Sequence, residues 1–266
     1  MSKRFFRAKE KLRSERIKIE LPELDEIDKR LTPVLRTIYL LFNEGFYSSH
    51  GKLPLRKDLS LEAIRLCSLL IENNRTDTPE VNAKLSLMCF HISRFDARQN
   101  LDGDPILYDD QNRNDWNVKW ISKGEFFLHQ ATKGNVVSKY HLEAGIAFWH
   151  TRKEDTETKW KTIINLYDHL LKFESTPLIL LNRMYALSKA IGKEEAIQEA
   201  EKLNFTGNRY YYILLGELYA EKFAEKSRVN FHNALNLSKN SKEKSMIKRR
   251  MEELKNVDEK NQIIDL

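Results

Sequence analysis

The chain contains few residues that interrupt helices and no long apolar run. Only 9 glycines and 6 prolines occur among 266 residues, which favours long helices over many short strands. No apolar run approaches the roughly 20 residues of a membrane span. The opening segment MSKRFFRAKEKLR lacks the apolar stretch of a secretory signal. We therefore expect a cytoplasmic protein with no membrane partner.

Residue patterns typical of metal sites and catalysis are also missing. The two cysteines, Cys67 and Cys89, lie on periodic apolar faces, so we expect buried free thiols rather than a disulfide. The seven histidines lack metal-ligand spacing, and neither a phosphate-binding glycine loop nor a Gly-x-Ser-x-Gly motif occurs. Asp102, Asp104 and Asp109 do not have the spacing of an EF-hand loop. We expect no metal, no cofactor and no enzymatic activity.

The net charge of +6 is concentrated at the start of the chain. Residues 3–18 hold eight basic and two acidic side chains, a balance of 8 − 2 = +6, so the remaining residues sum to zero. On a helix, Arg4, Arg7 and Lys11 would form a basic stripe beside an apolar one. Together with Lys3 they are candidate contacts to DNA phosphates. A solvated basic terminus is the alternative interpretation.

Helical periodicity continues along nearly the whole chain. In the first long helix, Thr32-Pro33 is typical of a start, and Gly45 suits a left-handed position just past the end. Asp58 can cap the following helix. Residues 101–116 form the one long stretch without helical periodicity.

Five helical segments follow one another after Thr156. The spacing Leu215-Gly216-x-x-Tyr219-Ala220, followed by Phe231, resembles a degenerate tetratricopeptide repeat, in which a small residue such as Gly216 lets the partner helix approach. Generic helical hairpins are the alternative. We predict an all-α protein of antiparallel helical hairpins, with a tetratricopeptide-like right-handed stack in the C-terminal half.

A cluster of polar residues separates two apolar helices between positions 38 and 66. Its members are Asn43, Glu44, Arg56, Asp58, Glu62 and Arg65. Because an unpaired buried charge is costly, we expect Glu44 to pair with Arg56 or Arg65 in a buried clasp, which secondarily contacts another domain. An acid–base pair of Glu44 and Glu62 is the catalytic alternative, but no nucleophile or metal ligand accompanies it.

Six blocks of sequence occur in the order typical of one protein family. They are KRFFRAKEKLR, VLRTIYLLFNEGFYSS, RKDLSLEAIRL, LYDDQNRNDW, YHLEAGIAFWH and LYDHLLKFESTPLILLNRMYAL. They resemble the C-terminal part of large extracytoplasmic-function sigma factors, which carry a tetratricopeptide-like extension after sigma region 4. The first block is similar to the end of the region 4 recognition helix. The fourth singles out Asp110, Gln111, Arg113 and Trp116 as a loop motif.

The resemblance implies a division of the chain and a function. Residues 1–21 would be a remnant of region 4 with a linker, 22–154 a helical subdomain, 155–256 tetratricopeptide-like repeats and 257–266 a charged tail. RNA polymerase core and promoter DNA would be contacted through sigma regions that this chain lacks. The implied role is to regulate sigma activity in transcription initiation, through contacts with its own sigma domains or with a regulatory protein. The alternative is a free-standing helical-repeat adaptor that binds a protein or peptide.

Overall fold

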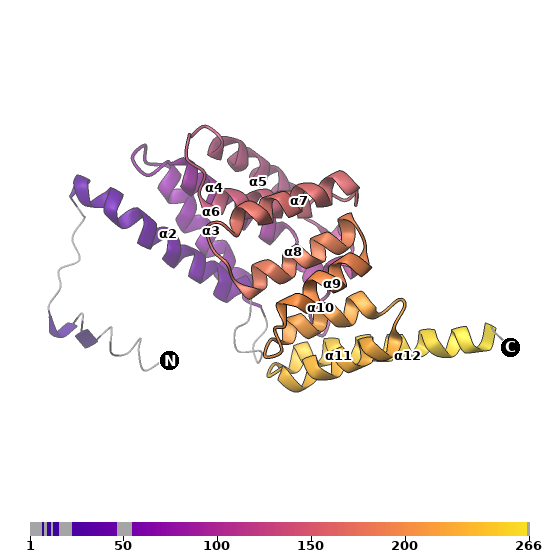
Figure 1. Cartoon of the computed structure of the whole chain (residues 1–266). Coiled ribbons are helices and arrows are strands. Elements are labelled where there is room, and N and C mark those ends of the chain that lie inside the picture. Colours follow the sequence, from indigo (N-terminus) through magenta and orange to yellow (C-terminus); the bar gives the residue numbers. More distant parts are fainter. Residues whose placement is uncertain (1–6, 8–9, 12, 16–22, 47–54, 265–266) are drawn as a thin grey trace.

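The structure, a computed structural model, describes residues 7, 10–11, 13–15, 23–46 and 55–264 (Figure 1). In this part of the chain the regular elements are eleven α-helices, α2 to α12, and three short 3-10 helices. These residues contain no β-strand, and only an isolated bridge joins Gln99 and Pro105. The prediction of an all-α fold is confirmed.

The first half of the molecule is built around one buried helix. Its helices are α2 (Leu24–Phe46), α3 (Lys57–Ile71), α4 (Pro79–Ser93), α5 (Val118–Ala131) and α6 (Lys139–His150). Helix α4 is buried nearly all round, and α2, α3, α5 and α6 all pack against it. A chain segment with three 3-10 helices (Asp96–Arg98, Tyr108–Asp110 and Arg113–Asp115) connects α4 to α5.

The second half is a stack of shorter helices. They are α7 (Glu157–Leu170), α8 (Pro177–Ala190), α9 (Lys193–Leu203), α10 (Arg209–Tyr219), α11 (Ala224–Leu237) and α12 (Ser241–Ile264). Each packs mainly on its neighbours in sequence, so α10 to α12 lie at the opposite end of the molecule from α4 and α5 (Figure 1). A Cβ atom at Gly216 would lie 2.9 Å from the Phe231 ring, so the predicted close approach of α10 and α11 is confirmed.

Helix α2 differs from the prediction at both ends. It begins at Leu24, so Pro33 lies inside it, on an exposed face where the carbonyl group that proline leaves unbonded can meet water. Gly45 is helical and buried, and it has no left-handed conformation. Its role is steric, because a Cβ atom there would lie 2.5 Å from the carbonyl oxygen of Arg56.

The joint between α2 and α3 is made by backbone groups at this glycine. The amide of Arg56 donates to the carbonyl of Gly45 at 2.9 Å, and Ser60 Oγ donates to the carbonyl of Phe42 at 3.2 Å. Asp58 is not the cap residue of α3, because the cap position is Arg56, whose side chain makes no capping hydrogen bond. Among the helices described here, none is both long and apolar enough to cross a membrane.

Candidate interaction groove

The four candidate DNA contacts lie at the start of the chain. Lys3 and Arg4 are outside the described residues. Arg7 and Lys11 are exposed, and Lys11 Nζ lies 3.7 Å from Glu15 Oε1, one helical turn away. Exposed pairs of this kind contribute little to stability and leave the lysine accessible to solvent. A DNA contact at these residues stays a prediction.

The polar cluster between α2 and α3 does not form the predicted buried clasp. Glu44, Arg56 and Arg65 are all exposed. Arg56 pairs with Asp58 at 2.5 Å, and Arg65 pairs with Glu62 at 2.7 Å, so each arginine bonds a carboxylate close to it in sequence. These hydrogen bonds lower the pKa of Asp58 and of Glu62. The prediction of a buried pair with Glu44 is wrong, since the backbones of α2 and α3 meet and exclude charged side chains.

The remaining member of that cluster is Asn43. Its side-chain oxygen is buried and accepts no hydrogen bond from the described residues. Residues 47–54 of the loop that follows lie outside the described residues, so the role of Asn43 in the clasp stays a prediction. The joint depends on Gly45 and Ser60.

The loop motif is packed inside the molecule. Gln111 is buried, and its side-chain oxygen accepts hydrogen bonds from the Arg94 guanidinium at 2.8 and 3.3 Å. That guanidinium also lies over the rings of Tyr108, at 4.7 Å, and Trp116, at 5.2 Å from the centroid. Trp116 is itself buried. These contacts attach the loop to the end of α4.

The same loop reaches the beginning of the second half. Arg113 forms an ion pair with Asp155, which also accepts from Lys159 Nζ at 2.8 Å. Lys159 is 1% exposed and donates to the Tyr108 hydroxyl at 3.0 Å. Burial raises the pKa of Tyr108 to about 12, so this hydroxyl stays protonated.

Contacts to α12 complete the connection. Arg250 lies 3.6 Å from Asp110 and forms two hydrogen bonds with Glu217 of α10. Ser245 Oγ donates to Asp104 at 2.6 Å. Residues 101–116 thus link α4, α7 and α12, and the loop motif has a structural role.

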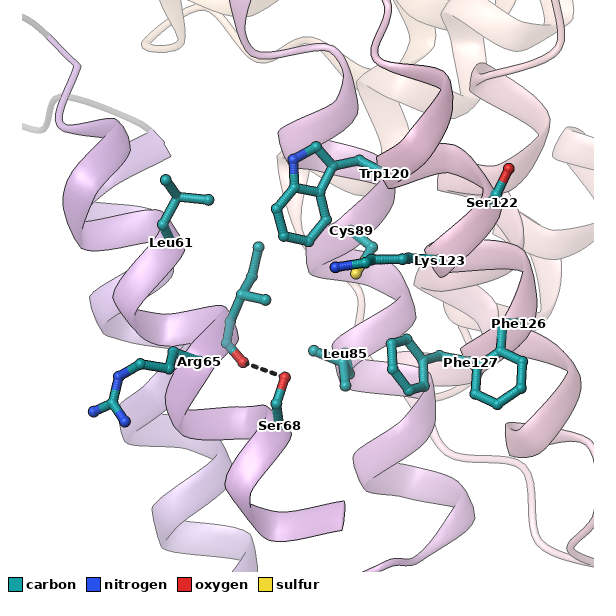
Figure 2. A pocket seen from close by; sticks show the side chains of 11 residues that line it. Leu61, Arg65, Ser68, Leu85, Cys89, Trp120, Ser122, Lys123, Phe126 and Phe127 are labelled. Carbon is teal, nitrogen blue, oxygen red and sulfur yellow. Dashed lines mark hydrogen bonds between the residues drawn. The ribbon is translucent and has the colours of Figure 1, made fainter. Parts of the chain in front are cut away.

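A groove of about 510 Å³ opens between α3 and α5, with α4 as its floor (Figure 2). Its lining consists of Leu61, Ile64, Arg65, Ser68, Leu85, Cys89, Trp120, Ser122, Lys123, Phe126 and Phe127. The lining residues of α3 have the spacing i, i+3, i+4, i+7, which places them on one helical face. Those of α5 form the opposite wall.

The groove stays open because α5 sits tightly on α4. A Cβ atom at Gly124 would lie 2.6 Å from the Phe90 ring, and Ser86 Oγ donates to the Gly124 carbonyl at 2.8 Å. Helix α3 packs on another side of α4 and hardly touches α5. The space between the two walls is therefore filled by no other helix that the structure describes.

The exposed surface of the groove is mainly apolar, and the thiol at its floor is unreactive. Phe126 is 57% exposed and Leu61 38% exposed, although both are large apolar side chains. Burial raises the pKa of the Cys89 thiol to about 12, so it is neutral and a poor nucleophile at neutral pH. Lys123 Nζ lies 4.7 Å above the Trp120 ring. Exposed apolar surface of this kind is typical of sites that bind another molecule.

This groove was not among the sites predicted from the sequence. A signal was present, because apolar residues occupy more of the circumference of α5 than one buried face needs. Trp120 and Phe127 pack partly on the core, whereas Phe126 remains exposed. Which of these faces stays uncovered depends on the position of α3.

Comparisons with known proteins place the groove inside a recognised sequence region. Residues 30–132, which run from α2 to the end of α5, match the sequence model of a family of unknown function, DUF6596. An uncharacterized protein of Rhizobium meliloti (strain 1021) is 33% identical over 258 residues, which cover 96% of this chain and 61% of that protein. The chain thus spans about 61% of the length of the curated relative it matches. No solved structure matches the chain significantly.

Proposed function

We propose that this chain is a regulatory interaction domain of an extracytoplasmic-function sigma factor, which controls transcription initiation through protein–protein contacts. The observation that carries the proposal is the apolar groove between α3 and α5. Exposed apolar patches bordered by polar groups are typical of protein interaction sites. The proposed partners are the sigma domains of the same polypeptide, or a regulatory protein.

The sequence blocks that resemble the sigma-factor extension support this proposal. Two of them, VLRTIYLLFNEGFYSS and RKDLSLEAIRL, contribute to α2 and α3, which meet at Gly45, and α3 forms one wall of the groove. A third supplies the loop motif that links the two halves. The relative is longer than the segment it shares with this chain, and this leaves room for further domains in that protein.

The experiment compares two phenylalanines with nearly the same exposure. Phe126 lies in the groove and is 57% exposed, whereas Phe173 follows α7 and is 55% exposed. The chain would be titrated by calorimetry with sigma regions 2 and 4 of the proposed sigma factor. The activity of these sigma regions in transcription in vitro would be measured with and without the chain. Phe126→Asp should weaken binding about tenfold, because it places a charge in an apolar contact. Phe173→Asp should leave both measurements unchanged.

Equal effects of the two substitutions, or no binding by the unaltered chain, would contradict the proposal.

The second candidate function is a free-standing adaptor. A smaller hollow of about 330 Å³ lies over α10 and α11, and Tyr211, Tyr212 and Tyr219 are among the residues that line it. Tyrosines are common in surfaces that bind peptides. An in-frame coding sequence for regions 2 and 4 immediately upstream of the chain would favour the sigma-factor proposal over the adaptor.

A further inference from the structure

We infer that the groove between α3 and α5 binds an amphipathic helix whose apolar stripe contains one carboxylate, and that this carboxylate pairs with Lys123. The inference rests on the proposed function, since it specifies the partner of the same groove. Three features of the groove lead to it: its shape, its exposed apolar side chains, and Lys123, the one lining charge without an ion pair in the described part of the chain.

The shape of the groove fits a helix. One wall uses Leu61, Ile64, Arg65 and Ser68, so a single face of α3 borders it along two turns. Helix α3 has 15 residues and is about 22 Å long at 1.5 Å per residue, which matches four turns of a partner helix. Helices commonly bind in grooves between two others through side chains with this same spacing.

The walls provide the apolar contact. Leu61 and Phe126 are exposed, and Trp120 is half-buried on the opposite wall from Leu61 (Figure 2). Leu85 and Cys89 form a fully buried floor beneath them. A helix laid over this floor would remove the exposed apolar surface from water, which favours binding.

The charge of the groove specifies the partner more closely. Among the residues that the structure describes, the lining contains two basic residues and no acidic one. Arg65 already forms two hydrogen bonds with Glu62. Lys123 forms no ion pair with any residue in the described part of the chain. Its ammonium group lies over the Trp120 ring, and its side chain points across the groove toward Cys89 (Figure 2).

An apolar partner would take the Lys123 ammonium group out of water. Removing a charge from water without pairing it is strongly unfavourable, so the partner must supply a carboxylate beside its apolar stripe. The same argument disfavours the chain's own segment 3–18 as the occupant, since that segment has a net charge of +6. A wholly apolar or a basic helix is likewise disfavoured.

Three synthetic 15-residue helical peptides test this inference. All carry leucines at i, i+3, i+4 and i+7, and a single position beside this stripe is Glu, Gln or Lys. Binding of each labelled peptide to the full chain is measured by fluorescence anisotropy. The Glu peptide should bind about tenfold more tightly than the Gln peptide, and the Lys peptide should bind most weakly.

Variants of the chain then assign the effect to Lys123. Lys123→Glu should reverse the order, so that the Lys peptide binds most tightly, and Lys123→Gln should abolish the preference. Lys119→Glu is the matched control, because Lys119 is an exposed lysine of the same helix that does not line the groove. It should preserve the original order, and thermal melting should show that all three variants fold.

Equal affinities for the three peptides, or the same reversal with Lys119→Glu, would overturn the inference. If no peptide binds while the chain still binds the sigma regions, the helix inference fails and the proposed function stands. If the Glu peptide is preferred while the sigma regions do not bind, the proposed function fails and the helix inference stands.

Discussion

Lys84 is a lysine in the core, on the buried helix α4. It is 0% exposed, and its Nζ lies 3.6 Å from the ring centroid of Tyr39 and 3.1 Å from that of Tyr140. It has no hydrogen-bond partner among the described residues, and neither has Glu143 Oε2 nearby. Burial lowers the pKa of Lys84 to about 7 and raises the pKa of Glu143. The two tyrosine rings stabilise the ammonium form only in part.

The lowered pKa of Lys84 predicts a pH dependence of stability. Between about pH 7 and the ordinary lysine pKa of 10.5, the unfolded chain binds a proton at this residue that the folded chain does not. The free energy of unfolding should therefore rise with pH through this window. Below about pH 7 the destabilisation caused by burying the Lys84 ammonium group is fully present. Lys84→Met should remove most of the rise, as measured by urea denaturation from pH 6.5 to 9, and the rest comes from Lys159, whose pKa is also lowered by burial.

The pH range of this measurement ends at 9 because the buried thiols change stability above that pH. Burial raises the pKa of Cys67 to about 12, so stability due to this group is lost as pH rises above its unfolded value of 9.0.

The control for Lys84→Met is Lys119→Met, a substitution at an exposed lysine, which should keep the wild-type dependence of stability on pH. An unchanged slope in Lys84→Met would show that the amine does not titrate in this window.

Gly45 gives a second prediction at the scale of a residue. Gly45→Ala would place a Cβ atom 2.5 Å from a backbone oxygen, which cannot move aside as a flexible side chain can. We expect a loss of about 1–3 kcal/mol in the free energy of unfolding. Gly207→Ala is the control, because no heavy atom lies within 4 Å of a Cβ atom there. Similar losses in the two variants would contradict the steric role of Gly45.

At the scale of elements, the segment 101–116 is an irregular element with a fixed structure. Its polar side chains take the place of a helical core, since Gln111, Asp110 and Asp104 each bond a residue of another element. These polar contacts join the segment to the end of α4 and to α12, so the segment has a fixed structure although it has no helical periodicity.

Removing one of these bonds should measurably weaken the fold. Gln111→Ala leaves the Arg94 guanidinium without its buried acceptor, and we expect a loss of about 1–3 kcal/mol. Denaturant unfolding followed by tryptophan fluorescence measures it. Leu101→Ala is the control in the same segment, because that side chain is fully exposed. A loss no larger than that of the control would mean that Gln111 does not help to hold the loop.

At the scale of the whole molecule, the uneven charge predicts weak DNA binding. The excess of +6 lies in residues 3–18, and such a segment neutralises only a handful of phosphates. The chain should bind promoter and scrambled duplexes equally, and its affinity should fall steeply between low and physiological salt. Titration against both duplexes at two salt concentrations measures this. Tight, promoter-selective binding at physiological salt would point to a complete DNA-binding module.

Much of the fold could be predicted from the sequence, but the groove could not. The helices of the second half and the close approach at Gly216 follow from spacing that is visible in a few turns of chain. The prediction of a buried clasp at Glu44 was wrong. The backbones of α2 and α3 meet at Gly45, and this close contact leaves no space for a buried ion pair. The loop motif was identified by its resemblance to a block of the family sequence. Its structural role could not be predicted, because its partner Arg94 lies outside the motif in sequence.

The sequence by itself determined that this protein is helical, where most of its helices lie and where its charge is concentrated. These properties depend on residues that are neighbours in the chain, so local periodicity and composition are sufficient. Only the tertiary structure decided which apolar faces remain exposed and which charges find partners. Whether Phe126 is buried and Lys123 is paired depends on how α3 and α5 are placed on α4, and that placement is set by contacts between residues far apart in the chain.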